Sequence, residues 1–513
     1  MRRFRILAIA ALFALGAGTV TAQSGSARRL SRTELENKIR GGWAGQMIGV
    51  SYGAPTEFVS NRRIIRWPIT WKPENVTNSI KQDDLYVEMT FAEVLDKEGL
   101  DATTEQFGEM FKNSKYMLWH ANASARRLLN RGIKAPWSGH PKFNAHADDI
   151  DFQIESDFIG LMTPGLPQVA NGFADRVGRV MNYGDGLYGG MFFSGMYAAA
   201  FFETDPRKVV EAGLASIPAD SKYGKVIRDV LDWSAGEPDW RKTWRKITDK
   251  WDRDDACPDG ALNEFNIDAK LNGAFVALGL LYGGGDFSKT LDVATRSGQD
   301  SDCNPSSAAG ILGVMIGYDA IPDEWKSGIP AIADTKFDYT NYTFNEIIAS
   351  TVARALKVVE HAGGQVSASE IVVPFQAPKA PVLEQWDVDA PTASLLSYGG
   401  AWTWSDGWEE RPAGMGRAKW TTQPGAQATL QFSGTGVVIR GEYDDQGGKA
   451  DVVLDGQPAG TIDASDVFNV DDSYYWFVTG LKPGPHTVQI KMQSANGKAS
   501  GTLGIEGAIA YGK

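Results

Sequence analysis

Two acidic loops hold the residues whose types and spacing could do chemistry in this chain. The first loop lies in RSGQDSDCNPSSAAGILGVMIG, residues 296–317, and places Asp300, Asp302 and Cys303 directly before an apolar, glycine-rich run. Charges beside such a buried run are costly unless a partner neutralises them. This loop therefore predicts a bound cation or a catalytic pocket.

The second loop, in KQDDLYVEM, offers further oxygen ligands from Gln82, Asp83 and Asp84. Asn304 as N-cap and Pro305 as first helical residue predict a helix that begins beside the first loop. Because the positive end of this helix would repel a cation, the carboxylates of the first loop need additional ligands such as these. Four converging carboxylates would raise one another's pKa values, whereas Mg²⁺ or Ca²⁺ would bind them. Alternatively, the second loop only favours the start of a helix.

A third block, GQMIGVSYGAPTEF at residues 45–58, precedes both loops. The three blocks resemble those of the ADP-ribosylglycohydrolase family, whose members carry G-x-x-x-G-D-A-x-G-x-P-x-E-F, then T-D-D, then G-G-D-T-D-T before an Ala/Gly-rich helix. The resemblance spans roughly residues 35 to 320. It implies an orthogonal bundle of α-helices with a dinuclear Mg²⁺ centre in a cleft, which hydrolyses a glycosidic bond to a ribose.

The resemblance also implies roles for individual residues. Glu57 matches a family glutamate near the substrate, and Asp302 would bridge two ions. Val50 stands where the family often has Asp, while Gln82 and Cys303 replace two threonines. Because a cysteine is a poor ligand for a hard cation, we expect one or two Mg²⁺ ions, with Ca²⁺ as an alternative. The implied metal ligands are Gln82, Asp83, Asp84, Asp300, Asp302 and Cys303.

Other acidic residues could also reach the cleft. In NAHADDIDFQIESD, Asp148 and Asp149 are interpreted as a solvated helix start, whereas Asp151 and Glu155 share a helix face, so one of them could line the site. For acid and base catalysis the first candidates are Glu57 and Asp83, with Asp151 next. The candidates for substrate binding are Asp185, Gly186 and Asn304.

Two of these interpretations have alternatives. The glycines around Asp185 in NYGDGLYGG could wrap a ligand or form a tight connection between buried helices. The G-x-S-x-G motif at residues 49–53 lacks the preceding strand that a serine hydrolase requires. The five histidines show no H-x-x-x-H pair or other zinc spacing; they are His120, His140, His146, His361 and His486.

The chain of 513 residues is expected to contain several domains. Apolar residues recur three and four positions apart from residue 31 to 362, which predicts an all-α domain. Residues 363–391 are proline-rich and are interpreted as a connector. Residues 392–513 predict an all-β, jelly-roll-like sandwich. Its aromatic side chains could form a sugar-binding platform or fill its core, and they are Trp402, Trp404, Trp408, Trp420, Tyr474, Tyr475 and Trp476.

Residues 1–22 have the charged start, apolar run and small-residue end of a signal peptide, which predicts a secreted or periplasmic protein without a membrane anchor. Its removal would change the formal net charge from −12 to −15, which argues against nucleic acid as a partner. In such a compartment Cys257 and Cys303 could form a disulfide.

The sequence thus predicts an exported, metal-dependent glycoside hydrolase of ADP-ribosylglycohydrolase type. Its substrate would be a glycan or an ADP-ribosyl compound. The alternative is a catalytically decayed protein that only binds saccharide, because Val50, Gln82 and Cys303 depart from the family pattern.

Overall fold

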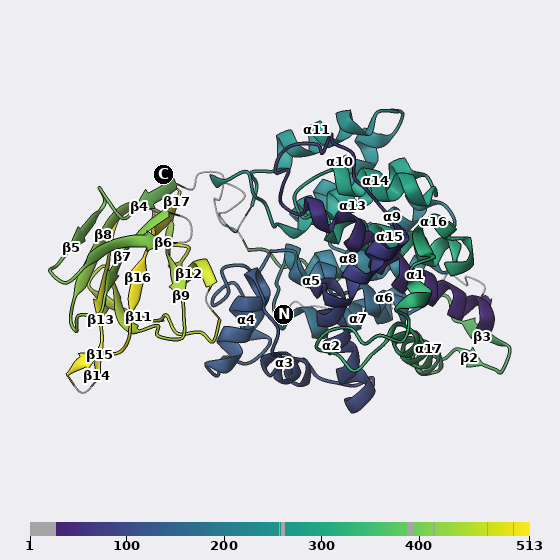
Figure 1. Ribbon diagram of the computed structural model, residues 1–513, viewed down its shortest axis with the longest axis horizontal. Helices are drawn as coiled ribbons and strands as arrows, with labels where there is room; N and C mark the ends of the chain where they lie inside the picture. Colours follow the sequence, from purple (N-terminus) through teal and green to yellow (C-terminus); the bar gives the residue numbers. More distant parts are fainter. Residues whose placement is uncertain are drawn as a thin grey trace, which may run out of the picture.

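The computed structural model describes residues 27–255, 257, 262–386, 394–413, 416–468, 470–495 and 497–512. It shows a helical body followed by a β domain beside it (Figure 1). The predicted signal peptide lies outside the described residues. This order confirms the predicted fold class, an all-α domain followed by an all-β domain.

The helical body contains long helices and short 3₁₀ turns. Its α-helices are α1 (Arg32–Gly53), α2 (Asp83–Glu98), α3 (Thr104–Lys112), α4 (His120–Asn130), α5 (Asp151–Ile154), α6 (Asp157–Leu161), α7 (Pro167–Gly178), α8 (Asp185–Ala200), α9 (Pro206–Leu214), α10 (Lys222–Ser234), α11 (Trp240–Trp251), α13 (Ala269–Gly283), α14 (Phe287–Arg296), α15 (Cys303–Ile316), α16 (Asp323–Lys326) and α17 (Phe344–His361). The 3₁₀ turns are η1 (Ala54–Thr56), η2 (Pro73–Lys81), η3 (Trp137–Gly139), η4 (Tyr318–Ala320) and η5 (Ile329–Ala331).

The most apolar helices form the centre of the body. Nearly every residue of α8, α13 and α15 is buried, as expected for helices that are apolar on all sides. The outer helices α10, α11 and α17 bury only one face. The buried centre therefore includes α15, which begins at the first acidic loop.

Helix α1 packs closely against α15 through glycines spaced four residues apart on one face. A Cβ atom at Gly45 would overlap the carbonyl oxygen of Ala309, and one at Gly49 would overlap that of Pro305. The two backbones can therefore approach closely only with glycine at these positions. This antiparallel contact places the end of α1 beside the start of α15.

The predicted connector, residues 363–391, begins instead with strands of the helical body. Strand β3 (Glu370–Val373) pairs with β1 (Arg28–Ser31) and β2 (Gln365–Val366), and Ile371 and Val373 are buried in the helical core. Farther along, Glu384 forms an ion pair of 3.0 Å with Arg179 of α7's C-terminal end. The body thus begins before residue 31 and extends beyond residue 362, because a strand near the chain's start pairs with this segment.

The β domain consists of antiparallel sheets around one hydrophobic core. The core combines Leu430 and Ile490 of a five-stranded sheet, ordered β11-β10-β13-β8-β5, with Ile439 and Ala508 of a four-stranded sheet, ordered β12-β9-β17-β4. Its strands are β4 (Ser394–Ser397), β5 (Trp402–Trp404), β6 (Glu409–Ala413), β7 (Gly416–Thr421), β8 (Gln427–Gly434), β9 (Gly436–Tyr443), β10 (Lys449–Leu454), β11 (Gln457–Asp463), β12 (Val470–Val478), β13 (Gly484–Met492), β14 (Ser494–Ala495), β15 (Lys498–Ala499), β16 (Leu503–Ile505) and β17 (Gly507–Tyr511).

The two domains meet at α4, the helix on the side of the body that faces the β domain in Figure 1. The guanidinium group of Arg127 lies 3.8 Å from the ring centroid of Tyr443, and its Nε lies 2.8 Å from a carboxylate oxygen of Asp466. The His146 ring stacks on Tyr474 of β12, with centroids 4.6 Å apart. Tyr474 is therefore engaged between the domains rather than in an exposed sugar platform.

Candidate active site

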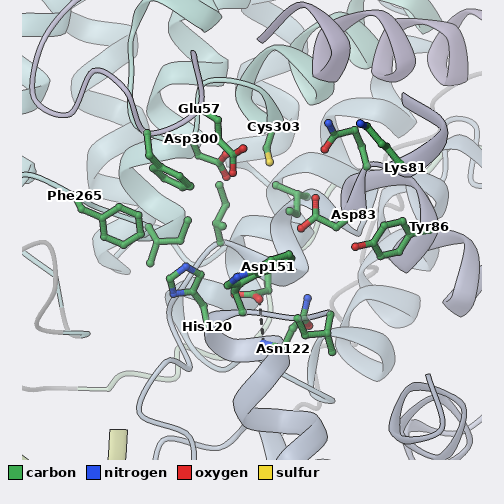
Figure 2. A pocket seen from close by; sticks show the side chains of 17 residues that line it. Glu57, Lys81, Asp83, Tyr86, His120, Asn122, Asp151, Phe265, Asp300 and Cys303 are labelled. Carbon is green, nitrogen blue, oxygen red and sulfur yellow. Dashed lines mark hydrogen bonds between the residues drawn. The ribbon is translucent and has the colours of Figure 1, made fainter. Parts of the chain in front are cut away.

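A cavity of about 450 Å³ in the helical body brings the predicted site residues together (Figure 2). Those that line it are Glu57, Gln82, Asp83, Asp151, Asp300 and Cys303. Asp84 and Asp302 lie behind this wall, since the Cys303 thiol is 3.3 Å from Asp84 Oδ2 and 3.7 Å from Asp302 Oδ1. The two acidic loops thus meet, as the sequence predicted.

Two contacts hold the segment after α1 against the loop before α15. The hydroxyl groups of Thr56 and Ser301 are 2.8 Å apart, and the backbone N–H of Phe58 donates to the carbonyl oxygen of Gln299 at 3.1 Å. Glu57 lies between the two anchored residues. Its carboxyl group is therefore fixed beside the first acidic loop.

Helix α15 begins earlier than the sequence indicated. Asp302 is its N-cap and Cys303 its first residue, whereas we expected Asn304 as the N-cap. The Asn304 amide instead donates to Asn272 Oδ1 of α13 at 2.9 Å, and Asn304 does not line the cavity. Its predicted role in substrate binding is therefore replaced by a contact between buried helices.

The acidic cluster, defined as Asp83, Asp84, Asp300 and Asp302, titrates abnormally. Burial is the largest cause for each. For Asp83, Asp84 and Asp300 neighbouring carboxylates add to it, raising the pKa of Asp83 to about 6 and those of Asp84 and Asp300 well above their usual range. The pKa of Asp302 is raised as well. Burial, then Asp302 and Asp83, raise the pKa of Glu57 to about 8.

The acidic cluster fits a divalent cation. Asp84 Oδ1 and Asp300 Oδ1 are buried without a hydrogen-bond partner among the described residues. In that part of the chain no lysine or arginine forms an ion pair with the four carboxylates, and Lys81 at the cavity edge is exposed. Oxygen-rich sites of this kind suit Mg²⁺ or Ca²⁺, whereas the Cys303 thiol does not.

The opposite wall of the cavity carries Asp151. Its carboxylate accepts hydrogen bonds from the backbone N–H groups of Ala121 and Asn122, at 3.2 and 3.0 Å, at the start of α4. Burial nonetheless raises its pKa to about 7. Glu155 lies behind, bonded to the Asn122 side chain. Of this pair, Asp151 is the one that reaches the cavity.

The family model for ADP-ribosylglycohydrolase matches residues 31–357. This chain belongs to the ADP-ribosylglycohydrolase family. The model for the N-terminal domain of carbohydrate esterase 2 matches residues 414–508, within the β domain. The β domain is thus similar to part of a carbohydrate-active enzyme.

Individual relatives of this ADP-ribosylglycohydrolase family member are distant. An A type blood N-acetyl-alpha-D-galactosamine deacetylase from Flavonifractor plautii is 29% identical over 181 residues, which cover 35% of this chain and 23% of that protein. The solved ADP-ribosylglycohydrolase-related protein complex has a TM-score of 0.45 and 16% identity, covering 64% of this chain and 99% of that chain. A family 6 carbohydrate-binding module from Clostridium cellulolyticum in complex with xylose has a TM-score of 0.18 and 17% identity, covering 23% of this chain and 97% of that chain.

Asp185 and Gly186, predicted to bind substrate, do not line the cavity of this family member. Asp185, the first residue of α8, accepts a hydrogen bond of 3.1 Å from the backbone N–H of Tyr223 near the start of α10. A Cβ atom at Gly186 would overlap the carbonyl oxygen of Ala147. The glycines of this loop therefore serve the tight connection between buried helices, which was the alternative interpretation.

Sequence reasoning missed most of the cavity's apolar wall and the histidine that lines it, His120. The wall includes Phe58, Tyr86, Trp119 and Phe265, and the ring of His120 stacks on that of Phe265 with centroids 5.7 Å apart. These residues come from separate loops and helices, so no local spacing could have grouped them. Aromatic walls of this kind suit the apolar face of a sugar ring.

Two further predictions concern the cysteines and the membrane. Cys257 and Cys303, both in the described part of the chain, are buried and not joined to each other. Within the same residues, the helices include none with both the length and the apolar character of a membrane span.

Proposed function

We propose that this family member is an exported, metal-dependent hydrolase that cleaves a glycosidic bond to a ribose-like or other sugar. The observation that carries the proposal is the cavity with Glu57 and Asp83 on one side, Asp151 on the other, and the acidic cluster at its wall. Its volume, about 450 Å³, lies within the usual range for small-molecule sites of about 300–1,000 Å³.

Glu57 is the proposed general acid. Glycosidic cleavage passes through an oxocarbenium-like state, in which a carboxylic acid protonates the leaving oxygen and a carboxylate activates water. Burial, then the neighbouring Asp302 and Asp83, raise the pKa of Glu57 to about 8. In the metal-free protein Glu57 therefore holds a proton at neutral pH.

Asp83 and Asp151 are the candidates for the base that takes a proton from water. Asp83 begins α2, and Asp151 is held by the two N–H donors at the start of α4. These donors favour the ionised carboxylate against its burial. Asp151 is thus fixed in position and oriented into the cavity from the wall opposite Glu57 (Figure 2).

The acidic cluster, with Gln82 beside it, would hold one or two Mg²⁺ ions, or Ca²⁺. A bound divalent ion supplies orientation of sugar hydroxyl groups and polarisation of water. The Cys303 thiol hydrogen bond to Asp84 is the observation that favours the second candidate function, a saccharide-binding protein without turnover. That bond competes for a carboxylate oxygen that the ion would need.

A glycan is the favoured substrate class. The predicted signal peptide would carry the protein out of the cytoplasm, and the β domain matches a carbohydrate-esterase module. Trp404 and Trp408, partly exposed in the β domain with ring centroids 4.8 Å apart, are candidates for contact with a glycan.

The proposal is tested by a panel of aryl furanosides, ADP-ribosyl compounds and N-acetylated glycans, each with Mg²⁺, with Ca²⁺ and with chelator. Metal-dependent release of a sugar from its aglycone is expected. Release of acetate without glycosidic cleavage would contradict the proposal and indicate the chemistry of the deacetylase relative. Saccharide binding that is insensitive to chelator, without turnover, would support the second candidate.

A further inference from the structure

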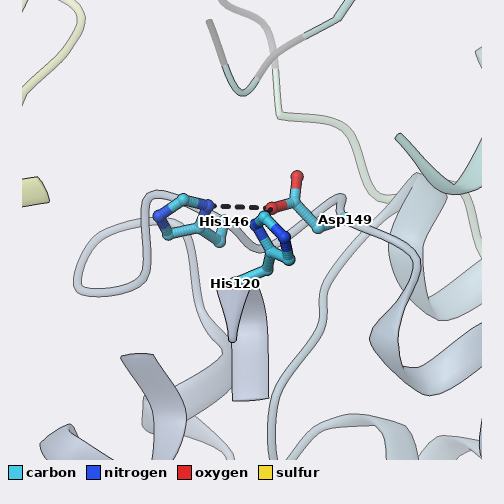
Figure 3. Close-up of side chains that lie close together, drawn as sticks. All are labelled: His120, His146 and Asp149. Atoms are coloured by element: carbon cyan, nitrogen blue, oxygen red, sulfur yellow. Dashed lines mark hydrogen bonds and ion pairs between the residues drawn. The ribbon is translucent and has the colours of Figure 1, made fainter. Parts of the chain in front are cut away.

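We propose that His120, His146, Asp149 and Cys257 form a second metal site, for Zn²⁺ or a similar transition-metal ion, where the helical body meets the β domain. Figure 3 shows the two imidazole rings beside the Asp149 carboxylate. We call these four residues the histidine cluster. The inference does not depend on the proposed hydrolase activity, because it concerns other residues and another class of ion.

Three donor atoms are close enough to bind one ion, and a thiol lies beside them. Atoms of His120, His146 and Asp149 all lie within 4.8 Å of one another, with His146 Nδ1 2.8 Å and His120 Nδ1 3.7 Å from Asp149 Oδ2. Cys257 Sγ lies 3.5 Å from His146 Nδ1. Ligands bound to tetrahedral Zn²⁺ at about 2.0–2.3 Å are separated from one another by about 3.3–3.8 Å. The 3.7 Å and 3.5 Å separations already meet this requirement, and the 2.8 Å separation is that of the hydrogen bond that an ion would replace. Cys257 lies outside the group of three, so its side chain would shift toward His120 and Asp149 to become the fourth ligand.

The donor set selects against the cations that suit the acidic cluster. Imidazole and thiolate groups favour Zn²⁺ and related ions, whereas Mg²⁺ and Ca²⁺ favour oxygen ligands. Burial lowers the pKa of His120 to about 4 and that of His146 well below its usual value. Both imidazoles are thus neutral at pH 7, the form that binds metal.

The histidine cluster links three segments of the chain to the β domain. His120 begins α4 and lines the cavity, and the His146 ring lies parallel to the ring of Tyr474 within 11°. The Tyr474 hydroxyl lies 3.8 Å from Cys257 Sγ. An ion bound here would fix His146 and Cys257, the residues on which Tyr474 of the β domain packs, relative to one wall of the cavity.

A hydrogen-bonded pair without an ion is the competing interpretation. The chain contains such a pair at the surface of the β domain, where His486 Nδ1 lies 2.7 Å from Asp455 Oδ2. Among the described residues that pair belongs to no group of three or more metal-ligating side chains. It therefore supplies a matched control for the histidine cluster.

The test uses the full chain, freed of metal by chelator, dialysed into excess Mg²⁺ and titrated with Co²⁺. Cobalt reports on a zinc site through its spectrum, because a thiolate ligand gives a near-ultraviolet charge-transfer band and tetrahedral geometry gives intense visible bands. We expect one equivalent of Co²⁺ per chain to produce both. Absence of the charge-transfer band, or bands of a six-coordinate ion only, would overturn the proposal.

Variants assign the spectrum to residues. Cys257→Ser is expected to remove the charge-transfer band, and His146→Gln to weaken Co²⁺ binding more than about tenfold, since loss of even an orienting neighbour costs about 10–100-fold. The controls Cys303→Ser and His486→Gln should keep the band and the affinity. A band that survives Cys257→Ser but disappears in Cys303→Ser would place the ion at the acidic cluster and reject the proposal.

A folding control accompanies these variants. Because Cys257 and His146 are buried, each variant is checked by circular dichroism and by its unfolding midpoint without metal. His120→Gln gives a second assay at a partly exposed side chain. It should also weaken Co²⁺ binding by more than about tenfold while the metal-free fold is unchanged. Unchanged affinity in both histidine variants would contradict the site.

Discussion

The acidic cluster and the histidine cluster contribute to walls of the same cavity, yet they arise in different ways. The acidic cluster comes from two short loops at the starts of α2 and α15. The histidine cluster joins residues 120, 146 and 149 with Cys257, which contacts His146. Burial acts on both, raising carboxyl pKa values and lowering imidazole pKa values. Each set thereby loses charge in the metal-free protein, and a cation of matching hardness would compensate each.

The largest expected effect separates the two clusters. Asp302→Ala should reduce turnover of the substrate found in the panel more than about 100-fold, because a direct ligand matters more than an orienting neighbour, whose loss costs about 10–100-fold. Calorimetry should show weaker Mg²⁺ binding, while the cobalt bands of the histidine cluster remain. Undiminished turnover would remove the acidic cluster from the reaction.

Glu57→Gln should have the next largest effect, a loss of about 10²–10⁴-fold in turnover with Mg²⁺ binding nearly unchanged, as for removal of a general acid. In the wild type the acid must be protonated, so activity should fall as the pH rises through the pKa of Glu57, about 8 without a cation. A bound cation shifts this fall to lower pH. A pH–rate profile of the variant that keeps the alkaline fall would contradict the assignment.

Gly49→Ala tests the packing that supports the acidic cluster. The new Cβ would overlap the backbone of α15, so we expect a loss of about 1–3 kcal/mol in unfolding free energy. We also expect the substitution to weaken Mg²⁺ binding at the acidic cluster more than Co²⁺ binding at the histidine cluster. Gly172→Ala, at an exposed position of α7 with open space around its Cβ, should be stabilising by about 0.4–1 kcal/mol. Urea unfolding measures both variants. Equal effects would show that the contact with α15 is not what requires glycine.

The smallest expected effect concerns the surface pair of His486 and Asp455. The hydrogen bond between the two side chains is the main cause that raises the pKa of His486. The stabilisation from this pair is therefore complete below the pKa of His486 in the unfolded chain, about 6.5, and is lost as the pH rises through its pKa in the folded protein. His486→Ala should therefore be less stable than the wild type at low pH, by no more than about 1 kcal/mol, and equal at high pH. Urea unfolding at several pH values checks the sign. A difference that grows with pH would contradict it.

The sequence could predict the acidic side of the site because its residues are adjacent in the chain at helix starts. Asp83 and Asp84 begin α2, and Asp300 and Asp302 directly precede α15. The four-residue spacing of Asp151 and Glu155 likewise indicated that one of them would reach the cavity. Local spacing identified the candidate residues because a helix start fixes which neighbours share a loop or a face, and the resemblance to the family joined the two loops into one site.

Other features depended on contacts between distant segments. The Asn304 side chain donates a hydrogen bond to α13 instead of capping α15, and Asp185 accepts one from the start of α10. Strand β3 pairs with β1 although most of the helical body lies between them in the sequence. The histidine cluster likewise forms only when α4, the 146–149 loop and Cys257 converge. Sequence by itself determined the two domain classes and the acidic loops, since these follow from periodicity and adjacency. Only the tertiary structure decided which side chains share the cavity, because close helix packing, such as that of α1 on α15, sets those distances.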